Sequence, residues 1–531
     1  MANVMLLDCT LRDGGYVNDW NFGHNNLTSV FERVVDAGVD IIEIGFLDER
    51  RGFDINHSIM PDTDSVYKIY GDLDKKNTMV VGMIDYGACQ IENIKPQNES
   101  FLDGIRVIFK KHIKEEAMEF CLKLKSMGYK VFSQLVSLTS YSDKELIDFV
   151  EIANRVKPYA VSMVDTYGLM HQDNLQYYFN IIDKHLDKSI GIGYHAHNNF
   201  QMGYANCIKI LSNVTHRTMI VDGSIYGMGK SAGNAPLELI AMHLNNRYGK
   251  NYNVSQILEA IDSNITQFYS PATWGYNMFY YIAASNDCHP NYVSYLMDKK
   301  TLSVSSINDI LSKLSKEKKL NYDRNYIDDL YWKYQHNEIN DQKDIEKIKK
   351  ILTDKKILIM GPGATVSIQK ENIVDYINLE KPLIISINYI PDYLEPDYIF
   401  LTNSKRYVQL STKLSKKGYK IIATSNVTGT YDKSFDYVLN FSSLIDEKAE
   451  IIDNSLIMLL KLLISIGVEK VMLAGFDGYS YDKSNYINTM MEYDFIKNKI
   501  DYLNNSVISF IDNNKNNINI QFLTKSLYEK R

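Results

Sequence analysis

The chain has 531 residues, too many for one ordinary domain, so about two or three hydrophobic cores are expected. Hydrophobic residues make up 45% and charged residues 23%, as in soluble globular proteins, and the net charge of −7 without a basic block argues against nucleic acid as a partner. The apolar start is too short for a signal peptide, and no apolar run is long enough to cross a membrane. The five cysteines are scattered without a Cys-x-x-Cys pair, which is typical of reduced thiols in a cytoplasmic protein.

The first half of the chain alternates short apolar runs with amphipathic segments. Expected strands are residues 4–7, 41–44, 79–84, 105–109, 130–136, 160–164, 191–195 and 219–221, with helical patterns between them. This alternation over about 250 residues is typical of a (β/α)8 TIM barrel, although an open doubly wound sheet also fits it. Polar residues favour the barrel, because they follow strand ends, which share one face of a barrel. These residues are Asp13, Glu43, Arg106, Gln134, Asp165, His195 and Asp222.

The second half resumes an α/β pattern after a helical stretch. Residues 251–345 are predicted to be a helical extension and linker, ending in alternating charges at 343–350. Strands are then expected at 357–360, 383–387, 398–401, 419–423 and 470–474, with helices at 366–376, 405–416, 454–466 and 494–513. We therefore expect a barrel domain over residues 1–250 and a smaller Rossmann-like α/β domain over residues 346–531.

Two histidines and one aspartate, far apart in the sequence, give the strongest chemical signal. His195 and His197 are two residues apart at a strand end, so their side chains can point to the same side. Asp13 follows the end of the first strand, and two nitrogens with one oxygen leave positions for water and substrate oxygens. This ligand set suits Mn²⁺, Mg²⁺ or another octahedral divalent ion better than a structural zinc site.

Arg12, beside the candidate metal ligand Asp13, indicates the chemistry. Making or breaking a carbon–carbon bond next to a keto acid passes through an enolate, whose oxygen a bound cation can stabilise as a Lewis acid. A guanidinium beside that oxygen adds a fixed positive donor where the charge develops. The alternative is that Arg12 only forms an ion pair across the barrel mouth.

Weaker candidates lie at the same predicted face. The glycine-rich segment 227–238 opens a helix, so it can bind a carboxylate or phosphate, or only turn the chain. Lys230 within it can meet an anionic second substrate or be a solvated lysine. Glu43 and Arg106 can contact substrate or the water on a metal, and their alternative is a structural pair on the barrel rim.

These segments together resemble the metal-dependent barrel aldolases and lyases related to hydroxymethylglutaryl-CoA lyase, most of all the 4-hydroxy-2-oxovalerate aldolases. The resemblance covers residues 4–245 and rests on Thr10-Leu11-Arg12-Asp13-Gly14, His195-Ala196-His197-Asn198-Asn199, the loop from Gly227 to Glu238, and Asp165-Thr166-Tyr167-Gly168. It implies Asp13, His195 and His197 as metal ligands, with Asn234 as a ligand or a neighbour of the ligands. It also implies Arg12 as the enolate stabiliser, Asp165 and Thr166 near the substrate, pyruvate and an aldehyde as substrates, and a homo-oligomer.

Tyr16 departs from this resemblance. Those aldolases carry a histidine as general base three residues after the metal aspartate, where this chain has Tyr16. An unperturbed phenol has a pKa of about 10, so Tyr16 is expected to be an acid or orienting group, or a base only with a strongly shifted pKa. Two alternatives stay open: a Claisen-type condensation of an acyl-CoA with a 2-oxo acid, and a barrel that has lost catalysis and only binds a ligand or serves as a scaffold.

The second domain begins with a strand and the glycine turn Gly361-Pro362-Gly363. Such a turn before a helix is a phosphate-binding geometry, although no acidic residue is placed for a ribose. By analogy with glycosyltransferase-like domains, Gly361 and Gly363 are predicted to contact a nucleotide or nucleotide-linked sugar. Action on the barrel's product and a role in assembly are the alternatives, and Asp477 is a further candidate site residue.

Overall fold

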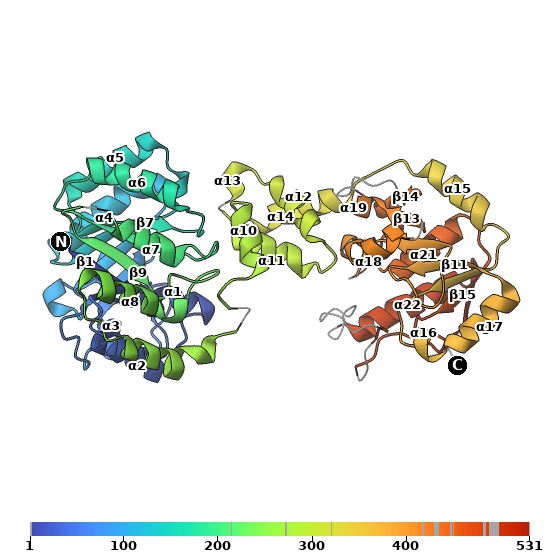
Figure 1. The fold of residues 1–531 in the computed structure, drawn as a ribbon, viewed down its shortest axis with the longest axis horizontal. Coiled ribbons are helices and arrows are strands. Elements are labelled where there is room, and N and C mark those ends of the chain that lie inside the picture. The colour runs from blue at the N-terminus through green and yellow to red at the C-terminus, as the bar shows by residue number, and fades with distance from the viewer. Residues whose placement is uncertain are drawn as a thin grey trace. The chain divides into compact units, whose positions relative to one another are not determined.

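The computed structural model describes residues 3–213, 215–270, 273–319, 321–416, 419–428, 435–446, 449, 451–481, 485–487 and 499–529. The chain folds into two compact units, Met1–Pro290 and Asn291–Arg531, each with its own sheet (Figure 1). The division falls within the stretch 251–345 that the sequence predicts to be a helical extension and linker.

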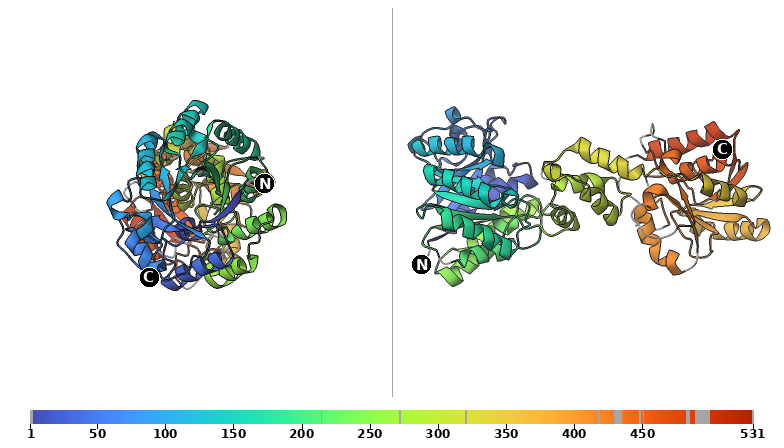
Figure 2. Two further views of the ribbon diagram at one scale, coloured as in Figure 1. Left: turned by 90° about the vertical axis from the view of Figure 1, so that its left-hand side faces the viewer. Right: turned by 90° about the horizontal axis from the view of Figure 1, so that it is seen from above.

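The first unit is a closed barrel of parallel strands. Each strand pairs with its neighbours in parallel, and β1 pairs with both β2 and β9, which closes the ring seen end-on in Figure 2 (left). The predicted TIM barrel and its eight predicted strands are confirmed, and a short strand β3 (Ile59–Met60) adds to β2 outside the ring. The barrel strands are β1 (Val4–Asp8), β2 (Ile41–Leu47), β4 (Met79–Asp85), β5 (Gly104–Phe109), β6 (Lys130–Leu135), β7 (Ala160–Asp165), β8 (Gly191–Ala196) and β9 (Met219–Gly223).

Helices surround the ring and bury its apolar outer surface (Figure 2). Helix α5 shows the local cause: Ser142 and Glu145 form a capping box at its start, and residues such as Leu146, Phe149 and Val150 recur on the buried face. The larger helices of this unit are α2 (His24–Asp36), α3 (Thr63–Tyr70), α4 (Lys114–Ser126), α5 (Asp143–Val156), α6 (Gln172–His185), α7 (Gly203–Leu211), α8 (Leu237–Tyr248), α9 (Val254–Ala260) and α10 (Met278–Ser285).

The interior of the barrel is apolar in one layer and polar in the next. A separate cluster that includes Ile41, Phe132 and Ile220 fills the interior between the strands. Alternate residues of a strand share one side, so the residue two positions later in each case also points inward. Those residues are Glu43, Gln134 and Asp222, all buried. The strand ends therefore carry polar side chains into the barrel mouth, as the sequence predicts.

The second unit contains a seven-stranded parallel sheet in the order β14-β13-β12-β11-β10-β15-β16. The predicted parallel α/β sheet is confirmed, and the finer Rossmann-like assignment stays a prediction. Strands β14 and β16 were not predicted, because both are short and β16 alternates polar with apolar residues. The strands are β10 (Ile357–Met360), β11 (Leu383–Ile387), β12 (Tyr398–Leu401), β13 (Lys420–Thr424), β14 (Tyr437–Leu439), β15 (Lys470–Ala474) and β16 (Asn519–Phe522).

Helices of the second unit include one that lies almost entirely in its core. Helix α21 (Ser455–Ser465) buries seven apolar residues and begins with Asn454 as its N-cap. The predicted helix 494–513 corresponds to α22 (Ile500–Asn514), and residues 494–498 lie outside the described residues. The remaining larger helices are α11 (Pro290–Asp298), α12 (Val304–Ser312), α14 (Arg324–Gln335), α15 (Gln342–Leu352), α17 (Lys370–Glu380) and α18 (Ser404–Lys416), with the short α16 (Thr365–Ile368) after β10.

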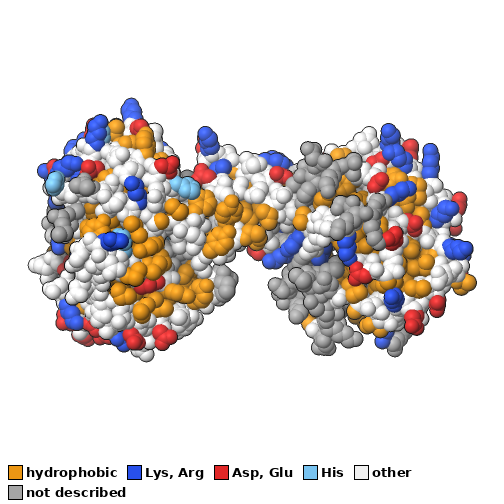
Figure 3. Space-filling model, in the orientation of Figure 1, with side chains coloured by type: hydrophobic (Ala, Val, Ile, Leu, Met, Phe, Trp, Pro, Cys, Tyr) orange, Lys and Arg blue, Asp and Glu red, His pale blue; other side chains and the backbone are white. Residues whose placement is uncertain are grey.

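The surface mixes charged and apolar side chains. Figure 3 shows hydrophobic side chains on the face of the first unit where α8 lies, and Leu239 and Met242 of α8 are among the exposed apolar residues. Within the described part of the chain, no helix combines the length and the hydrophobicity needed to span a membrane. The homo-oligomer expected from the sequence stays a prediction.

Arg217 is a buried residue just before β9 that binds the end of α6. Its guanidinium donates to the Asp183 carboxylate at 2.6 Å and to the carbonyls of Asp187 and Ile190 at 2.7 Å each. It also donates to the carbonyl of Leu186 at 3.0 Å. The Leu186 carbonyl belongs to the C-cap of α6, and the other two carbonyls lie in the segment after the helix, so Arg217 pairs backbone acceptors that no helical N–H reaches.

We expect Arg217→Met to lower the free energy of unfolding of the first unit by about 3 kcal/mol, because it leaves several buried acceptors and one carboxylate without their donor. Calorimetric or denaturant unfolding measures the change. Arg155→Met, at an exposed position on α5, is the matched control and should change it by less than about 0.5 kcal/mol. Equal effects of the two substitutions would contradict the role given to Arg217.

Candidate metal centre

The segment after β1 places Arg12 and Asp13 in the barrel mouth. A short helix α1 (Thr10–Asp13) and the 3-10 turn η1 (Gly14–Val17) carry the chain across the end of the ring, with both side chains buried. A Cβ atom added to Gly15 would lie 2.0 Å from Cδ1 of Trp20, so a side chain at position 15 would clash with the indole ring. The indole N–H of Trp20 donates to the Arg12 carbonyl at 2.7 Å. Glycine at 15 therefore lets Trp20 fix this segment.

The two histidines are oriented through their Nδ1 atoms. Nδ1 of His195 lies 3.0 Å from the carboxylate of Asp222, and Nδ1 of His197 lies 3.1 Å from the backbone carbonyl of Asp165. A hydrogen bond at one ring nitrogen sets the tautomer and leaves the other nitrogen as a ligand atom. Both imidazoles therefore keep Nε2 for a metal.

Asp13, His195 and His197 meet at one point, as predicted. One ligand atom from each lies within 4.8 Å of the others, and Nε2 of His197 is 3.5 Å from Oδ2 of Asp13. Asn234 joins them, because its side-chain amide donates to Oδ2 of Asp13 at 2.8 Å.

Two buried atoms of this group have no hydrogen-bond partner among the described residues: Nε2 of His197 and Oδ1 of Asn234. Buried polar atoms are normally paired. An unpaired nitrogen and an unpaired oxygen beside a carboxylate are what a cation-binding site provides, so these four residues fit a divalent metal.

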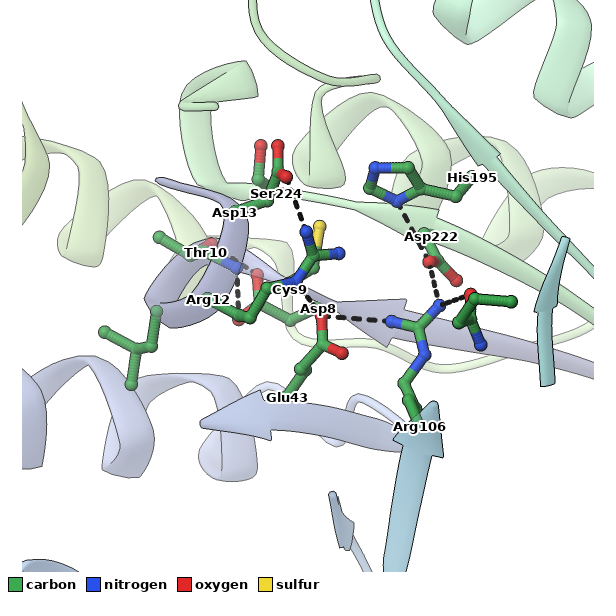
Figure 4. A network of polar contacts seen from close by, with 12 residues as sticks. Asp8, Cys9, Thr10, Arg12, Asp13, Glu43, Arg106, His195, Asp222 and Ser224 are labelled. Carbon is green, nitrogen blue, oxygen red and sulfur yellow. Dashed lines mark hydrogen bonds and ion pairs between the residues drawn. The ribbon is translucent and has the colours of Figure 1, made fainter. Parts of the chain in front are cut away.

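A chain of alternating charges supports the ligands (Figure 4). Arg12 donates from Nη1 to Asp13 at 2.6 Å and from Nε to Glu43 at 2.7 Å. Arg106 lies 3.0 Å from the same Glu43 oxygen and donates to Asp222 at 2.5 Å and to Gln134 at 3.1 Å. Since Asp222 holds His195, the chain of contacts runs from one metal ligand to another.

These contacts set the protonation of the ligands. Burial alone would raise the pKa of Asp13, but the Arg12 guanidinium and His197 hold that pKa well below its usual range. Burial tends to raise the pKa of Asp222, but the Arg106 guanidinium outweighs this effect and the pKa is lowered. Burial lowers the pKa of His195, so its imidazole is neutral at physiological pH. An ionised carboxylate and a neutral imidazole are the forms that bind metal.

Glu43 and Arg106, predicted as substrate contacts, are both buried within this charge chain. Asp165 and Thr166, also predicted near the substrate, hold loops. The Asp165 carboxylate accepts from the backbone N–H groups of Leu169 and Met170, and Thr166 accepts from the N–H of Ser137 at 2.7 Å. A substrate contact for any of the four stays a prediction.

The glycine-rich loop closes over Asp13. Lys230 donates its backbone N–H to Oδ2 of Asp13 at 3.2 Å. A Cβ on Gly229 would lie 2.3 Å from Nδ2 of Asn234 and 2.7 Å from Oδ2 of Asp13, so a side chain at this position would displace both groups. The loop thus approaches the ligands closely because residue 229 has no side chain.

Tyr16 and Lys230 lie together at the edge of the site. The Lys230 ammonium is 5.2 Å from the centre of the Tyr16 ring, which also contacts Trp20. Tyr16 is 43% exposed, yet partial burial and the Asp13 carboxylate raise its pKa to about 12, so the phenol is protonated at neutral pH. Burial lowers the pKa of Lys230, and burial together with Lys230 lowers the pKa of His289 to about 4.

Gly361 and Gly363 of the second unit pack against its own backbone. A Cβ on Gly361 would lie 2.7 Å from the Gly475 carbonyl, and one on Gly363 would lie 2.4 Å from Oδ1 of Asp477. The Asp477 carboxylate accepts from the N–H of Thr365 at 2.9 Å, where a phosphate was expected. The predicted nucleotide contact therefore has no support in the geometry of this turn.

Comparison with known proteins places the barrel in a known family. The sequence profile of the HMGL-like family matches residues 3–263. This domain belongs to the HMGL-like family. The resemblance stated from the sequence is thereby confirmed.

Two curated relatives of the HMGL-like domain carry the same name. The chain is 26% identical over 253 residues to 4-hydroxy-2-oxovalerate aldolase of Marinomonas sp. (strain MWYL1), covering 46% of this chain and 70% of that protein. It is 26% identical over 244 residues to 4-hydroxy-2-oxovalerate aldolase 2 of Salinispora arenicola (strain CNS-205), covering 46% and 69%. Among solved structures, hydroxymethylglutaryl-CoA lyase from Pseudomonas aeruginosa matches at 14% identity and a TM-score of 0.42, covering 51% of this chain and 96% of that chain.

Three residues of the site have roles that sequence reasoning missed. Asp222 was noted only as polar at a strand end, Gly229 only as part of the glycine-rich loop, and Trp20 was not singled out. The adjacent glycines at 14 and 15 and the Gly-x-Gly at 227–229 were signals of close backbone approach, but they do not say what approaches.

We expect Gly229→Ala to weaken Mn²⁺ binding at least ten-fold, because the added methyl group displaces Asp13 and Asn234. Calorimetric titration with Mn²⁺ measures the affinity. Gly52→Ala is the matched control, since its Cβ would meet no atom within 4 Å. Unchanged Mn²⁺ affinity in the Gly229 variant would contradict this description of the loop.

Proposed function

We propose that the HMGL-like domain is a divalent-metal-dependent aldolase that makes or cleaves a carbon–carbon bond through the enolate of pyruvate or a similar 2-oxo acid. The observation that carries the proposal is the contact of Arg12 with Asp13 beside two imidazole Nε2 atoms at the barrel mouth. The names of the two curated relatives support the same reaction class.

The proposed ligands are Asp13, His195, His197 and Oδ1 of Asn234. Mixed nitrogen and oxygen ligands favour Mn²⁺ or Mg²⁺. When bound, such an ion supplies Lewis-acid polarisation of the substrate's keto oxygen.

Arg12 is proposed to stabilise the negative oxygen of the enolate. Its Nε and Nη1 are held by Glu43 and Asp13, and in the part of the chain that the structure describes its Nη2 makes no hydrogen bond. Nη2 is therefore the group that can donate to substrate. Because the other two nitrogens are fixed, the guanidinium does not have to reorganise as charge develops. Arg106 is committed to Glu43, Gln134 and Asp222, so we give it a positioning role.

Tyr16 is proposed to donate a proton to the acceptor. When the enolate carbon adds to an aldehyde, the aldehyde oxygen becomes an alkoxide that must take up a proton. A phenol with a pKa of about 12 is a donor at neutral pH. The neighbouring Lys230 ammonium provides a positive charge for an acceptor that carries a carboxylate or phosphate.

The direct test is Mn²⁺ binding combined with oxaloacetate decarboxylation, a reaction that passes through the pyruvate enolate. We expect the full chain to bind Mn²⁺ and to decarboxylate oxaloacetate, and we expect Asp13→Asn to lose both properties. Mn²⁺ binding without enolate chemistry on any 2-oxo acid would leave only a binding module. Thiol release from an acyl-CoA in the presence of a 2-oxo acid would instead indicate the Claisen-type condensation.

Arg12→Ala separates the two functions of the site. We expect its Mn²⁺ affinity to stay within a few-fold of the wild type and its decarboxylation rate to fall about 10²–10³-fold, because a preorganised donor to the enolate is removed. Arg155→Ala is the control, since Arg155 is exposed in the last turn of the outer helix α5. Normal turnover in Arg12→Ala would refute its role.

Tyr16→Phe tests the proton donor. We expect the rate of bond formation between pyruvate and an accepted aldehyde to fall about 10²–10⁴-fold, while oxaloacetate decarboxylation, which forms no alkoxide, changes less than about three-fold. Because the phenol's pKa is raised to about 12, it loses its proton only near that pH, so wild-type bond formation should show no alkaline fall from Tyr16 below about pH 11. Tyr67→Phe, on the exposed side of α3, is the control. Equal losses in both reactions would show that Tyr16 acts otherwise.

A further inference from the structure

A cavity of about 190 Å³ opens at the carboxyl end of the sheet in the second unit. Its walls come from the turns after β10 and β15, from residues after β11 and β12, and from the start of α21. One water needs roughly 10–15 Å³ of such space, so the cavity has room for a small organic molecule.

The topology of the sheet makes this a place where ligands bind. From β10 the chain adds β11 to β14 on one side, and it then returns to add β15 and β16 on the other. The strand order therefore reverses between β10 and β15. In open parallel sheets, ligands bind outside the carboxyl ends of the strands at such a reversal.

One wall of the cavity is a fixed set of hydroxyl and amide groups. Asn388 donates from its side chain to Thr402 at 3.1 Å and to Ser455 at 2.9 Å, and the two hydroxyl oxygens are 2.7 Å apart. Asn388 follows β11, Thr402 follows β12 and Ser455 begins α21, so the bonds join three elements. Asn388 has a φ of +49°, a left-handed conformation that asparagine adopts more readily than most residues, and its hydrogen bonds hold it there. The wall is thus preorganised.

Two carboxylates line the same cavity. Asp453 stands immediately before the N-cap of α21, and burial raises its pKa although Lys299 opposes the effect. Asp477 caps the turn after β10 through Thr365. Carboxylates repel a phosphate but accept hydrogen bonds from hydroxyl groups, and amides and hydroxyls can both donate and accept. The polar groups therefore match a ligand rich in hydroxyls.

Aromatic side chains form another part of the lining. Phe476 and Tyr479 follow β15, and Tyr486 and Tyr528 lie beside the same cavity. Their rings give flat apolar surfaces that can cover the face of a ring-shaped ligand. Arg406 is also in the lining and is buried, with Nη1 donating to Gln409 at 2.9 Å.

We propose that this cavity binds a ring compound with neighbouring hydroxyl groups, the chemistry shared by a free monosaccharide and the ribose of a nucleoside. The hydroxyls bond to Asp453 and to the group formed by Asn388, Thr402 and Ser455, and the ring lies against the tyrosines. The proposal does not depend on the reaction of the barrel. It also requires no phosphate at the glycine turn, where Asp477 occupies the N–H of Thr365.

The test is ligand binding to the full chain by calorimetry and ligand-detected NMR. The probes are the four ribonucleosides, their 2′-deoxy forms, methyl glycosides of glucose, galactose, mannose and N-acetylglucosamine, and inorganic phosphate. We expect at least one hydroxylated probe to bind. Binding by nucleosides that is lost in the 2′-deoxy forms identifies ribose, and binding by glycosides identifies a free sugar. Either result supports the proposal.

Two pairs of variants locate the binding. Ser455→Ala should lower the affinity for the probe at least ten-fold. Ser465→Ala, at the other end of the same helix, should change that affinity less than two-fold. Asp453→Asn keeps the shape of its side chain and should also weaken binding at least ten-fold, against exposed Asp375→Asn as its control. The proposal is overturned if no hydroxylated probe binds, if only phosphate binds, or if neither Ser455→Ala nor Asp453→Asn weakens the bound probe.

Discussion

The chain of buried charges from Asp13 through Arg12, Glu43 and Arg106 to Asp222, which binds the neutral His195, is the constraint on which the barrel mouth depends. Burying these groups is unfavourable unless every charge has its partner, and removal of one partner leaves a costly isolated charge. Arg12 and Asp13 come from the segment after β1, and the other four groups come from β2, β5, β8 and β9. The chain of charges is therefore complete only when the barrel is closed, so folding and assembly of the site are one event.

The same contacts give each site residue its chemical character. Asp13 stays ionised because Arg12 neutralises it, and His195 stays neutral because it is buried and bonded to Asp222. Arg12 is held by two carboxylates and keeps one nitrogen for substrate. Tyr16 and Lys230 lie outside this chain, at the partly exposed edge of the site, where the second substrate would enter. In the proposed reaction the 2-oxo acid would meet the buried, paired part of the site, and the acceptor would meet the less enclosed edge.

Sequence patterns predicted the features that depend on local order. Apolar runs located the barrel strands, and the spacing of His195 and His197 with Asp13 at another strand end predicted the metal group, because residues two apart share one side of a strand. The pairing of Glu43 with Arg106 and an ion pair of Arg12 across the barrel mouth stood as alternatives in the sequence analysis, and both are present. Other partnerships across the barrel could not be predicted. The bond from Asp222 to His195 exists only because β8 and β9 pair, and the indole of Trp20 rests on Gly15 only after the segment turns back. In the second unit the glycine turn predicted a phosphate site. The N–H of Thr365 instead donates to the carboxylate of Asp477, 112 residues later in the chain, which no local pattern could show.

The protonation of the metal ligands has a consequence for how the barrel responds to its surroundings. Asp13 has already lost its proton and His195 is already neutral near pH 7, so these two candidate ligands would give up no proton if an ion bound. The buried contacts thus prepare both groups for a cation before any cation arrives.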